Sequence, residues 1–304
     1  MNLYKINKQY SLFLFFFSLF FLTIASEVVE TKKIIMPYKT IICFFLISIL
    51  GVSHGSLDHI KGFKLMKIYK MHNGYFFYPL YISCCLLVIF FWTILPLITL
   101  ILFLLVASYH FGKEDSCVEN IIKKKYINIL YLLKGSFVVL APLSIHTEET
   151  LQIFQILTIN LPLPHDNVLL TLILISFIAN LIIMSLSNYE GFLLADWITI
   201  LILNLFFSPL VAFTIYFCFL HSVKHSFGLI YEIDKKNFKA GLNKFVKKAL
   251  PLTIITTILF TVSVYILINY YVLDEAILKV IFIGLASLTF PHILLEYLIE
   301  KNEK

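Results

Sequence analysis

Residues 76–112 read FFYPLYISCCLLVIFFWTILPLITLILFLLVASYHFG and contain no Asp, Glu, Lys or Arg. A helix needs about 20 predominantly apolar residues to cross a bilayer, so this stretch is long enough for two crossings. Pro96 lies near its middle, where a proline ends one helix and can begin the next. We therefore predict two membrane helices, 76–94 and 97–112, that are joined by a tight turn at Pro96.

The rest of the chain has the same apolar character. Of its 304 residues, 60% are hydrophobic and only 14% are charged, and the mean hydropathy is +0.91. Soluble proteins average about 45–50% apolar and about 25% charged residues, so the composition excludes a soluble enzyme, a disordered chain and a secreted disulfide scaffold. The five cysteines form no CxxC pair, and we interpret them as buried thiols. The predicted fold class is all-α, a polytopic transmembrane helical bundle of about eight to ten spans.

Ten stretches are long and apolar enough to be counted as spans. They are 10–26, 40–56, 76–94, 97–112, 127–145, 168–187, 193–207, 209–229, 249–271 and 276–298. We expect residues 1–39 to form an extra N-terminal helix with its connector, and residues 40–304 to form a single transmembrane catalytic bundle. The first span can instead be a cleaved signal peptide, but its apolar run is longer than the usual signal core, which favours a retained helix.

Lysines in the loops orient the bundle. The net charge of +6 comes from lysines that follow the second, fourth and eighth spans and from the C-terminus, whereas the 146–167 loop has no Lys. Cytoplasmic loops carry the excess of positive charge in membrane proteins, so the excess indicates loops and no nucleic-acid partner. With ten spans we predict a multi-pass protein of the cell (inner) membrane with both termini cytoplasmic. The connector 27–39, which carries three lysines on the outer side, is the exception.

Six of the nine histidines lie in or beside predicted spans and near one membrane depth, close to the cytoplasmic face. They are His54, His59, His110, His221, His225 and His292. We assign the other three, His72, His146 and His165, to solvated surface. An ionisable side chain inside a membrane is costly, so it usually faces the interior of the bundle and serves the function.

The spacing of these residues favours a metal site or a proton-handling site. His221 and His225 are one helical turn apart and can bind one metal ion together. Asp58 lies one turn after His54 and can fix the tautomer of a neighbouring histidine. A lone HxxxH pair is weak evidence, since interfacial histidines and chance produce it too. All-imidazole ligation suits iron, zinc or copper. Three glycines that permit close approach of helices flank these residues, namely Gly51, Gly55 and Gly112.

Four motifs in order make the pattern far more specific. They are GVSHGSLDH at 51–59, YHFG at 109–112 followed by Asp115, HSVKH at 221–225, and TFPH at 289–292. This order resembles the Brp/Blh family of membrane β-carotene dioxygenases. The chain departs from the family pattern at Tyr109, where the family has Trp, and at Lys224, where it has Arg. Neither change removes a proposed metal ligand.

The resemblance implies a function and a site. The family cleaves the central 15,15′ double bond of β-carotene with O2, yields two molecules of all-trans retinal, and depends on Fe(II). Carried over by motif, the ligands are His54, His110, His221 and His225, and no catalytic residue beyond them is implied. The expected supporting residues around the ligands are Asp58, His59, His292 and Tyr109. The implied partners are β-carotene, O2, the lipid bilayer and a retinal-binding opsin that accepts the product.

Three other functions compete with this interpretation. A di-iron desaturase or hydroxylase needs several histidine boxes, and this chain has a single HxxxH. A haem-bearing cytochrome needs pairs of facing histidines deep in the bilayer. A proton-coupled or metal-coupled transporter can use the same histidine cluster without O2 or carotenoid.

Overall fold

The computed structural model describes residues 3–27, 38–71, 73–116, 126–157, 166–186 and 192–302, and gives the backbone alone for residues 21–27, His54 and Asp166. All regular structure in these ranges is helical, which confirms the predicted fold class. In chain order the elements are α1 (Leu3–Glu27), α3 (Lys39–Leu46), the π turn η3 (Ile47–Gly51), the 3₁₀ turn η4 (Ser53–Leu57), α4 (Asp58–Ile68), the 3₁₀ turn η5 (Gly74–Phe76), α5 (Phe77–Ile94), α6 (Pro96–Glu114), α7 (Ile127–Gly135), α8 (Phe137–Ile145), α9 (Thr147–Ile156), α10 (Asp166–Leu186), α11 (Phe192–Phe206), α12 (Pro209–Ile215), the π turn η6 (Tyr216–His221), α13 (Ser222–Ile233), α14 (Phe238–Leu267) and α15 (Leu273–Asn302).

Eight helices in the described ranges are long and apolar enough to cross a membrane. They are Lys39–Ile68, Gly74–Ile94, Pro96–Glu114, Ile127–Ile145, Asn167–Leu186, Pro209–Ile233, Phe238–Leu267 and Leu273–Asn302. The expected span 193–207 is the shorter apolar helix α11, and the expected span 10–26 lies within α1. The protein is therefore a polytopic membrane bundle, and the turn predicted at Pro96 separates α5 from α6.

Several helices run well beyond the apolar stretches that predicted them. The second span continues through η4 and α4 to Ile68, and α14 begins at Phe238, where the predicted span begins at 249. The added turns carry lysines, which suit the polar edge of a membrane. Hydropathy alone therefore misses these turns, because an amphipathic helix lacks a continuous apolar run.

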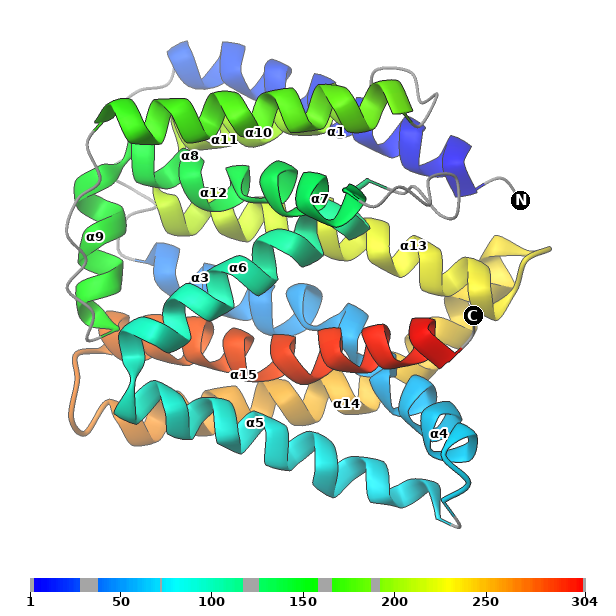
Figure 1. The fold of residues 1–304 in the computed structure, drawn as a ribbon. Coiled ribbons are helices and arrows are strands. Elements are labelled where there is room, and N and C mark those ends of the chain that lie inside the picture. The colour runs from blue at the N-terminus through cyan, green and yellow to red at the C-terminus, as the bar shows by residue number, and fades with distance from the viewer. Residues whose placement is uncertain are drawn as a thin grey trace.

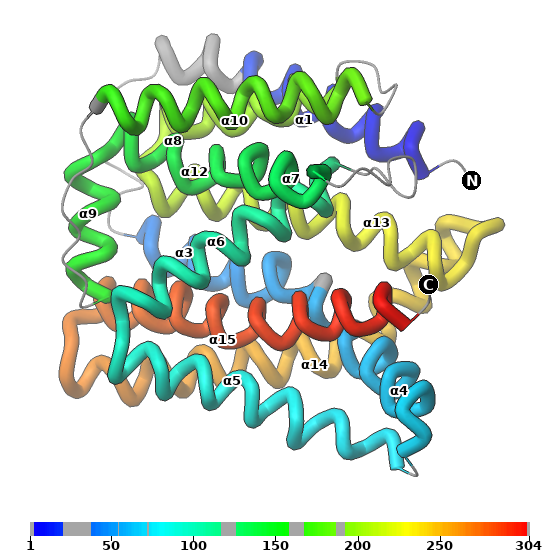
Figure 2. Tube along the Cα trace, in the orientation of Figure 1, coloured from blue at the N-terminus to red at the C-terminus, as the bar shows by residue number. Residues whose placement is uncertain are grey.

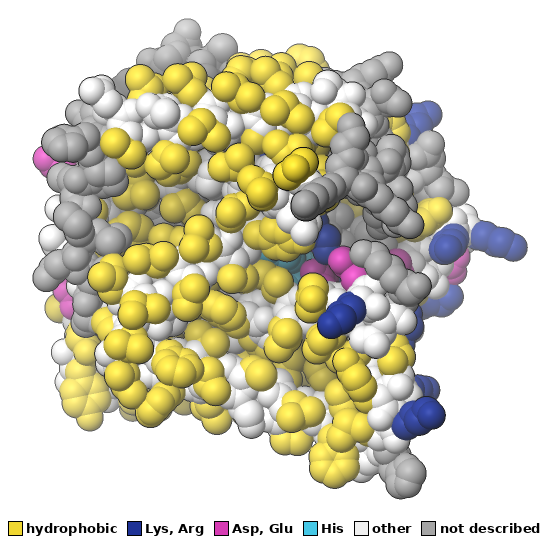
Figure 3. Space-filling view, viewed as in Figure 1, with side chains coloured by type: hydrophobic (Ala, Val, Ile, Leu, Met, Phe, Trp, Pro, Cys, Tyr) yellow, Lys and Arg dark blue, Asp and Glu magenta, His cyan; other side chains and the backbone are white. Residues whose placement is uncertain are grey.

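The helices run roughly alongside one another, with α1, α10 and α11 on one side of the bundle and α5 and α14 on the other (Figures 1 and 2). Helices α6, α13 and α15 lie between these two sides, while α9 and α4 cover opposite ends. The start of α1 and the end of α15 lie at the same end of the bundle, where lysines gather on the visible face (Figure 3). Helices α6, α13 and α15 therefore line the interior of the bundle and carry residues of three of the four histidine motifs.

The N-terminal helix is packed onto this bundle. Helix α1 contacts α11 and α13, and the Tyr10 hydroxyl donates a hydrogen bond to the carbonyl of Phe219 in η6 (2.6 Å). That carbonyl lies inside a π turn, where the regular α-helical bonding is interrupted. The division of the chain at residues 39 and 40 stays a prediction.

Two π turns meet in the middle of the bundle. Gly51 ends η3, and its carbonyl accepts a hydrogen bond from the Ser222 hydroxyl, which directly follows η6 (2.9 Å). A Cβ on Gly51 would overlap the ring of Phe217, so a larger residue at position 51 would force this ring to shift. Such turns are rare and often occur at functional sites. Here they lie beside two of the motifs that the sequence singled out.

Helices α6 and α7 touch through their backbones. A Cβ on Gly112 would overlap the carbonyl of Tyr131, and a Cβ on Gly135 would overlap the carbonyl of Ser108. Small residues let membrane helices approach this closely. The expectation that Gly112 permits a close approach is therefore confirmed, and the crossing holds the end of α6, which carries His110, against its neighbour.

Candidate metal centre

Four imidazole rings meet between helices that are far apart in the sequence. His110 comes from α6, His221 from η6, His225 from α13 and His292 from α15. The ring centroid of His110 lies 5.2 Å from that of His221, 5.2 Å from that of His292 and 6.3 Å from that of His225. The side chains are at most 7% exposed. Three of the four predicted ligands are thus together, and His292 joins them.

The two histidines of HSVKH lie one turn apart, as their spacing predicts. Their rings are nearly parallel, with an interplanar angle of 5° and centroids 6.4 Å apart. His225 also lies 5.8 Å from His292, measured between ring centroids. One helix face therefore presents both imidazoles toward α6 and α15.

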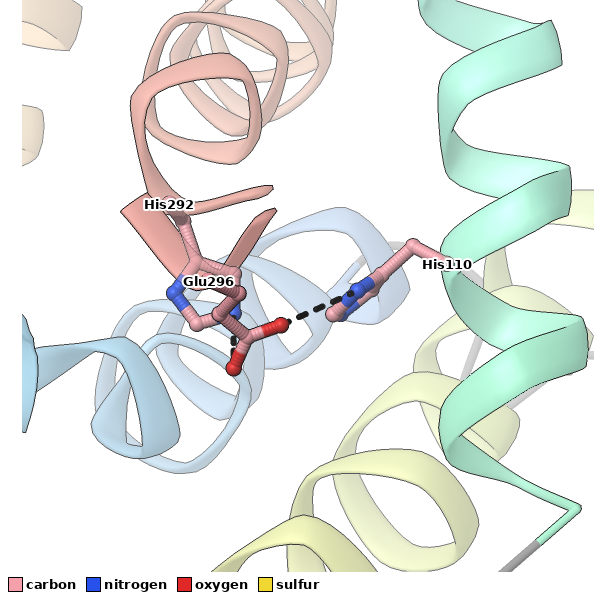
Figure 4. Close-up of side chains that lie close together, drawn as sticks. All are labelled: His110, His292 and Glu296. Carbon is pink, nitrogen blue, oxygen red and sulfur yellow. Dashed lines mark ion pairs between the residues drawn. The ribbon is translucent and has the colours of Figure 1, made fainter. Parts of the chain in front are cut away.

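A carboxylate lies among three of these rings. Glu296 is one turn after His292 on α15, and its oxygens lie 3.6 Å from His225 Nε2, 3.7 Å from His292 Nε2 and 3.8 Å from His110 Nδ1. Figure 4 shows His292 and Glu296 on one helix, facing His110 across the gap. Lys61 from α4 donates a hydrogen bond to the same carboxylate (3.0 Å). The negative charge of Glu296 is therefore balanced within the bundle.

These donors have the chemistry and spacing of a metal site. His110, His292 and Glu296 each offer a ligand atom, and these atoms lie within 4.8 Å of one another. Neighbouring ligand atoms about 2.1 Å from one metal ion are about 3–3.5 Å apart, slightly less than the distances around Glu296. Two histidines and one carboxylate form the ligand set typical of non-haem Fe(II) oxygenases. The residues present therefore fit an iron ion.

Two aspartates orient two of the rings. His292 Nδ1 donates to Asp58, the first residue of α4 (2.9 Å), and His221 Nδ1 donates to Asp115, which follows α6 (2.9 Å). Burial acts to raise the pKa of Asp115, but the charge and hydrogen bond of His221, with Lys224 and Lys134 nearby, hold that pKa below its usual value. A carboxylate on Nδ1 leaves Nε2 available to a metal, as in other metalloproteins.

The other residues expected at the site have different surroundings. The side chain of His54 lies outside the described residues, but a Cβ on the next residue, Gly55, would lie 3.9 Å from His292 Nδ1. His59 Nδ1 pairs with the carbonyl of Ser56 (3.0 Å) in its own turn. Tyr109 packs toward α7, with its hydroxyl 3.5 Å from Asn128 Oδ1. The described contacts of His59 and Tyr109 do not reach the cluster.

Of the histidines assigned to solvated surface, one is partly buried. His146 lies between α8 and α9, and its Nε2 is 2.6 Å from the carbonyl of Asn204. The assignment of His146 to solvated surface therefore holds only in part, because its ring is half-buried and pairs with a carbonyl in α11. His72 and His165 lie outside the described residues.

Sequence reasoning missed Glu296 as a member of the site. Its signal is the i, i+4 spacing from His292, the same spacing that drew attention to His221 and His225. Glu296 stands in the segment EYLIEKNEK, where charged residues close the chain and resemble a solvated terminus. Helix α15 instead stays in the bundle to Asn302, which places Glu296 inside.

Comparison with known proteins agrees with the motif order. A family model described as beta-carotene 15,15'-dioxygenase matches residues 45–300. A beta-carotene 15,15'-dioxygenase of an uncultured marine bacterium, 66A03, is 30% identical over 261 residues, which cover 82% of this chain and 90% of that relative. No solved structure matches the chain.

Proposed function

Because the chain belongs to the beta-carotene 15,15'-dioxygenase family, we propose that it cleaves β-carotene at the central 15,15′ double bond with O2 and releases two molecules of all-trans retinal. The observation that carries this proposal is the buried cluster of four imidazoles inside apolar helices, in which Glu296 lies among His110, His225 and His292 and His221 lies beside His110. We propose Fe(II) as the metal. When bound, iron supplies the redox-active centre at which O2 reacts with the polyene.

For the ligands we retain the set that the motifs imply, His54, His110, His221 and His225. The group of His110, His292 and Glu296 supports an alternative set. His110 belongs to both sets. The two sets make different predictions for the metal content of Ala variants: a ligand loss removes the ion, whereas the loss of an orienting residue weakens binding about 10–100-fold.

Apolar side chains around His221 support a hydrocarbon substrate. The rings of Phe111 and Phe217 pack against the imidazole, with centroids 4.7 and 5.8 Å away. They exclude water from that side of the ring. A symmetric polyene offers no polar group to bind, so its central bond must be positioned by shape, and placement of the reactants supplies much of the rate.

An apolar cavity adds to this support. It lies between α1, α11 and the α12–η6 segment, and Phe219 and Leu220, which directly precede His221, form part of its wall. The hydroxyls of Ser18 and Thr199, which also line it, bond to carbonyls of their own helices. The cavity therefore suits a hydrocarbon.

The orientation and the fate of the product belong to the same proposal. We propose that the Lys-rich end faces the cytoplasm, with both termini on that side, in the cell membrane. The substrate reaches the site from the bilayer, where it dissolves, and retinal leaves by the same phase. An opsin in that membrane is the acceptor that we propose.

The test is expression in cells that make β-carotene. Cells with the wild-type chain should lose orange colour and accumulate retinal under aerobic, iron-replete conditions, as chromatography of their pigments measures. Cells with His110→Ala at equal expression should keep their colour. Unchanged pigment with the wild-type chain would contradict the proposal. Cation flux into liposomes that needs neither O2 nor carotenoid would favour the transporter.

A further inference from the structure

A tyrosine lies behind one of the proposed ligands. The Tyr216 hydroxyl donates a hydrogen bond to Asp115 Oδ2 (2.6 Å), while His221 Nδ1 donates to the other oxygen, Oδ1 (2.9 Å). Tyr216 is 2% exposed, Asp115 6% and His221 1%, so water does not compete for these bonds. An ionised carboxylate only accepts hydrogen bonds, and both of its oxygens are used here. The aspartate is therefore held from two sides.

The π turn is what brings both donors to one carboxylate. Tyr216 and His221 are the first and last residues of η6, five positions apart. In an α-helix, residues five apart point about 140° away from each other around the axis. A π turn bonds residue i to residue i+5 and so places them on one face. The irregular backbone thus has a consequence for the geometry of the site.

The same construction recurs on the opposite side of the cluster. The Tyr81 hydroxyl from α5 donates to Asp58 Oδ2 (2.8 Å), and His292 Nδ1 donates to the same carboxylate, 2.9 Å from Oδ1 and 3.0 Å from Oδ2. There the three residues come from three different helices, α5, α4 and α15. A π turn builds the first set and the packing of three helices builds the second, yet both sets place a tyrosine and a histidine on one aspartate. This repetition indicates that the arrangement serves the imidazoles.

We propose that Tyr216 is a positioning residue of the metal centre: it fixes Asp115, and Asp115 in turn holds the His221 ring with Nε2 directed to the metal. The proposal rests on the proposed function only in requiring that the histidine cluster binds a metal ion. Tyr216 does not touch substrate or metal. Its loss leaves one oxygen of Asp115 without its donor and lets the carboxylate, and with it the imidazole, rotate.

The test is metal binding by the purified full chain in detergent. Fe(II) affinity is measured by competition with a chelator, and Co(II) is used as a coloured probe of ligand geometry. Tyr216→Phe should weaken Fe(II) binding by about tenfold, the low end for residues that support a ligand, and alter the visible Co(II) spectrum. Tyr131→Phe is the matched control, because Tyr131 is buried against Ile183, Phe192 and Leu193. It should bind both metals like the wild type.

A double-mutant cycle separates positioning from a general loss of stability. Since Tyr216 acts through Asp115, adding Tyr216→Phe to Asp115→Asn should change Fe(II) affinity less than twofold. Independent effects would add instead. Unchanged affinity and spectrum in Tyr216→Phe, or full additivity with Asp115→Asn, would overturn the inference while the proposed function stands. A wild-type chain that binds neither metal would overturn both.

Discussion

Helices α14 and α15 look alike in sequence and play different parts in the bundle. Each has 30 residues and one internal proline, and each is apolar enough to span a membrane. In the most apolar stretch of α15, 56% of the residues are buried, against 11% in α14. Helix α15 also buries His292 and Glu296, whereas most of α14 faces outward. Hydropathy therefore identifies a span but does not say which spans enclose the site.

The largest expected effect is on bound iron, and it should follow from replacing a polar residue of α15 but not one of α14. His292→Ala should lower bound iron at least tenfold and retinal formation with it, because Nε2 of His292 faces the Glu296 carboxylate. Thr257→Ala on α14 is the control. Its hydroxyl bonds to carbonyls of Thr253 and Ser48, so iron content should stay near the wild-type value.

Both quantities are measured on purified protein, by metal analysis and by chromatography of products. A loss that exceeds about 100-fold in iron affinity would identify His292 as a ligand, and a smaller loss would identify it as an orienting residue. Equal iron content in the two variants would show that the difference in burial between α14 and α15 has no bearing on metal binding.

A substitution at the contact between α14 and α15 should have an intermediate effect, on the stability of the fold. A Cβ on Gly284 of α15 would lie 2.6 Å from the Phe260 ring of α14, so Gly284→Ala overpacks the interface. Overpacking costs about 1–3 kcal/mol, and thermal unfolding in detergent should show the loss. Adding Phe260→Leu should recover part of it.

Gly228→Ala on α13 is the matched control, since a Cβ there meets no described atom within 4 Å. That exchange should leave stability unchanged or raise it by about 0.5–1 kcal/mol, because alanine favours helix more than glycine does. A Gly284→Ala chain as stable as the wild type would mean that α14 and α15 can separate freely at this point.

The smallest effect is expected where α14 begins. Asp234 accepts hydrogen bonds from the backbone N–H of Asn237, from Lys244 Nζ and from the N–H of Lys236, which lower its pKa. A lowered folded-state pKa stabilises the fold above the unfolded value of about 3.9, and this stabilisation disappears as the pH falls through the folded pKa. Asp234→Asn should therefore melt slightly earlier than the wild type at pH 7 and equally at pH about 2. A difference that persists in acid would contradict this origin.

Much of the fold follows from sequence because the bilayer imposes it. Every backbone group in lipid must be bonded internally, so apolar runs become helices, and the pair around Pro96 follows directly. The sequence also brings His110, His221 and His225 to one depth. The irregular turns η3 and η6 are different, because neither propensity nor period indicates a π turn. Their existence depends on tertiary contacts such as Ser222 with Gly51.

The site could be predicted only in part for a related reason. Motif spacing identifies residues that share a helix, such as His221 and His225. Glu296 and Lys61 meet only because α15 and α4 pack together, across 235 positions of sequence. The same holds for Tyr81 and Asp58. Contacts of this kind depend on how helices are rotated about their axes, which a composition rich in Leu, Ile and Phe leaves open.

The π turn η6 also bears on how this gene can change in length. Removing one codon between Tyr216 and His221 would leave these two residues four positions apart in an ordinary α-helix, about 40° around the axis and still on one face. Ser222, Lys224 and His225 would then keep nearly their present direction relative to α12. Removing one codon within the regular helix α13 would instead rotate everything after it by about 100°. We therefore expect natural variants of this protein to tolerate the loss of one residue within η6 more readily than the loss of one residue within α13.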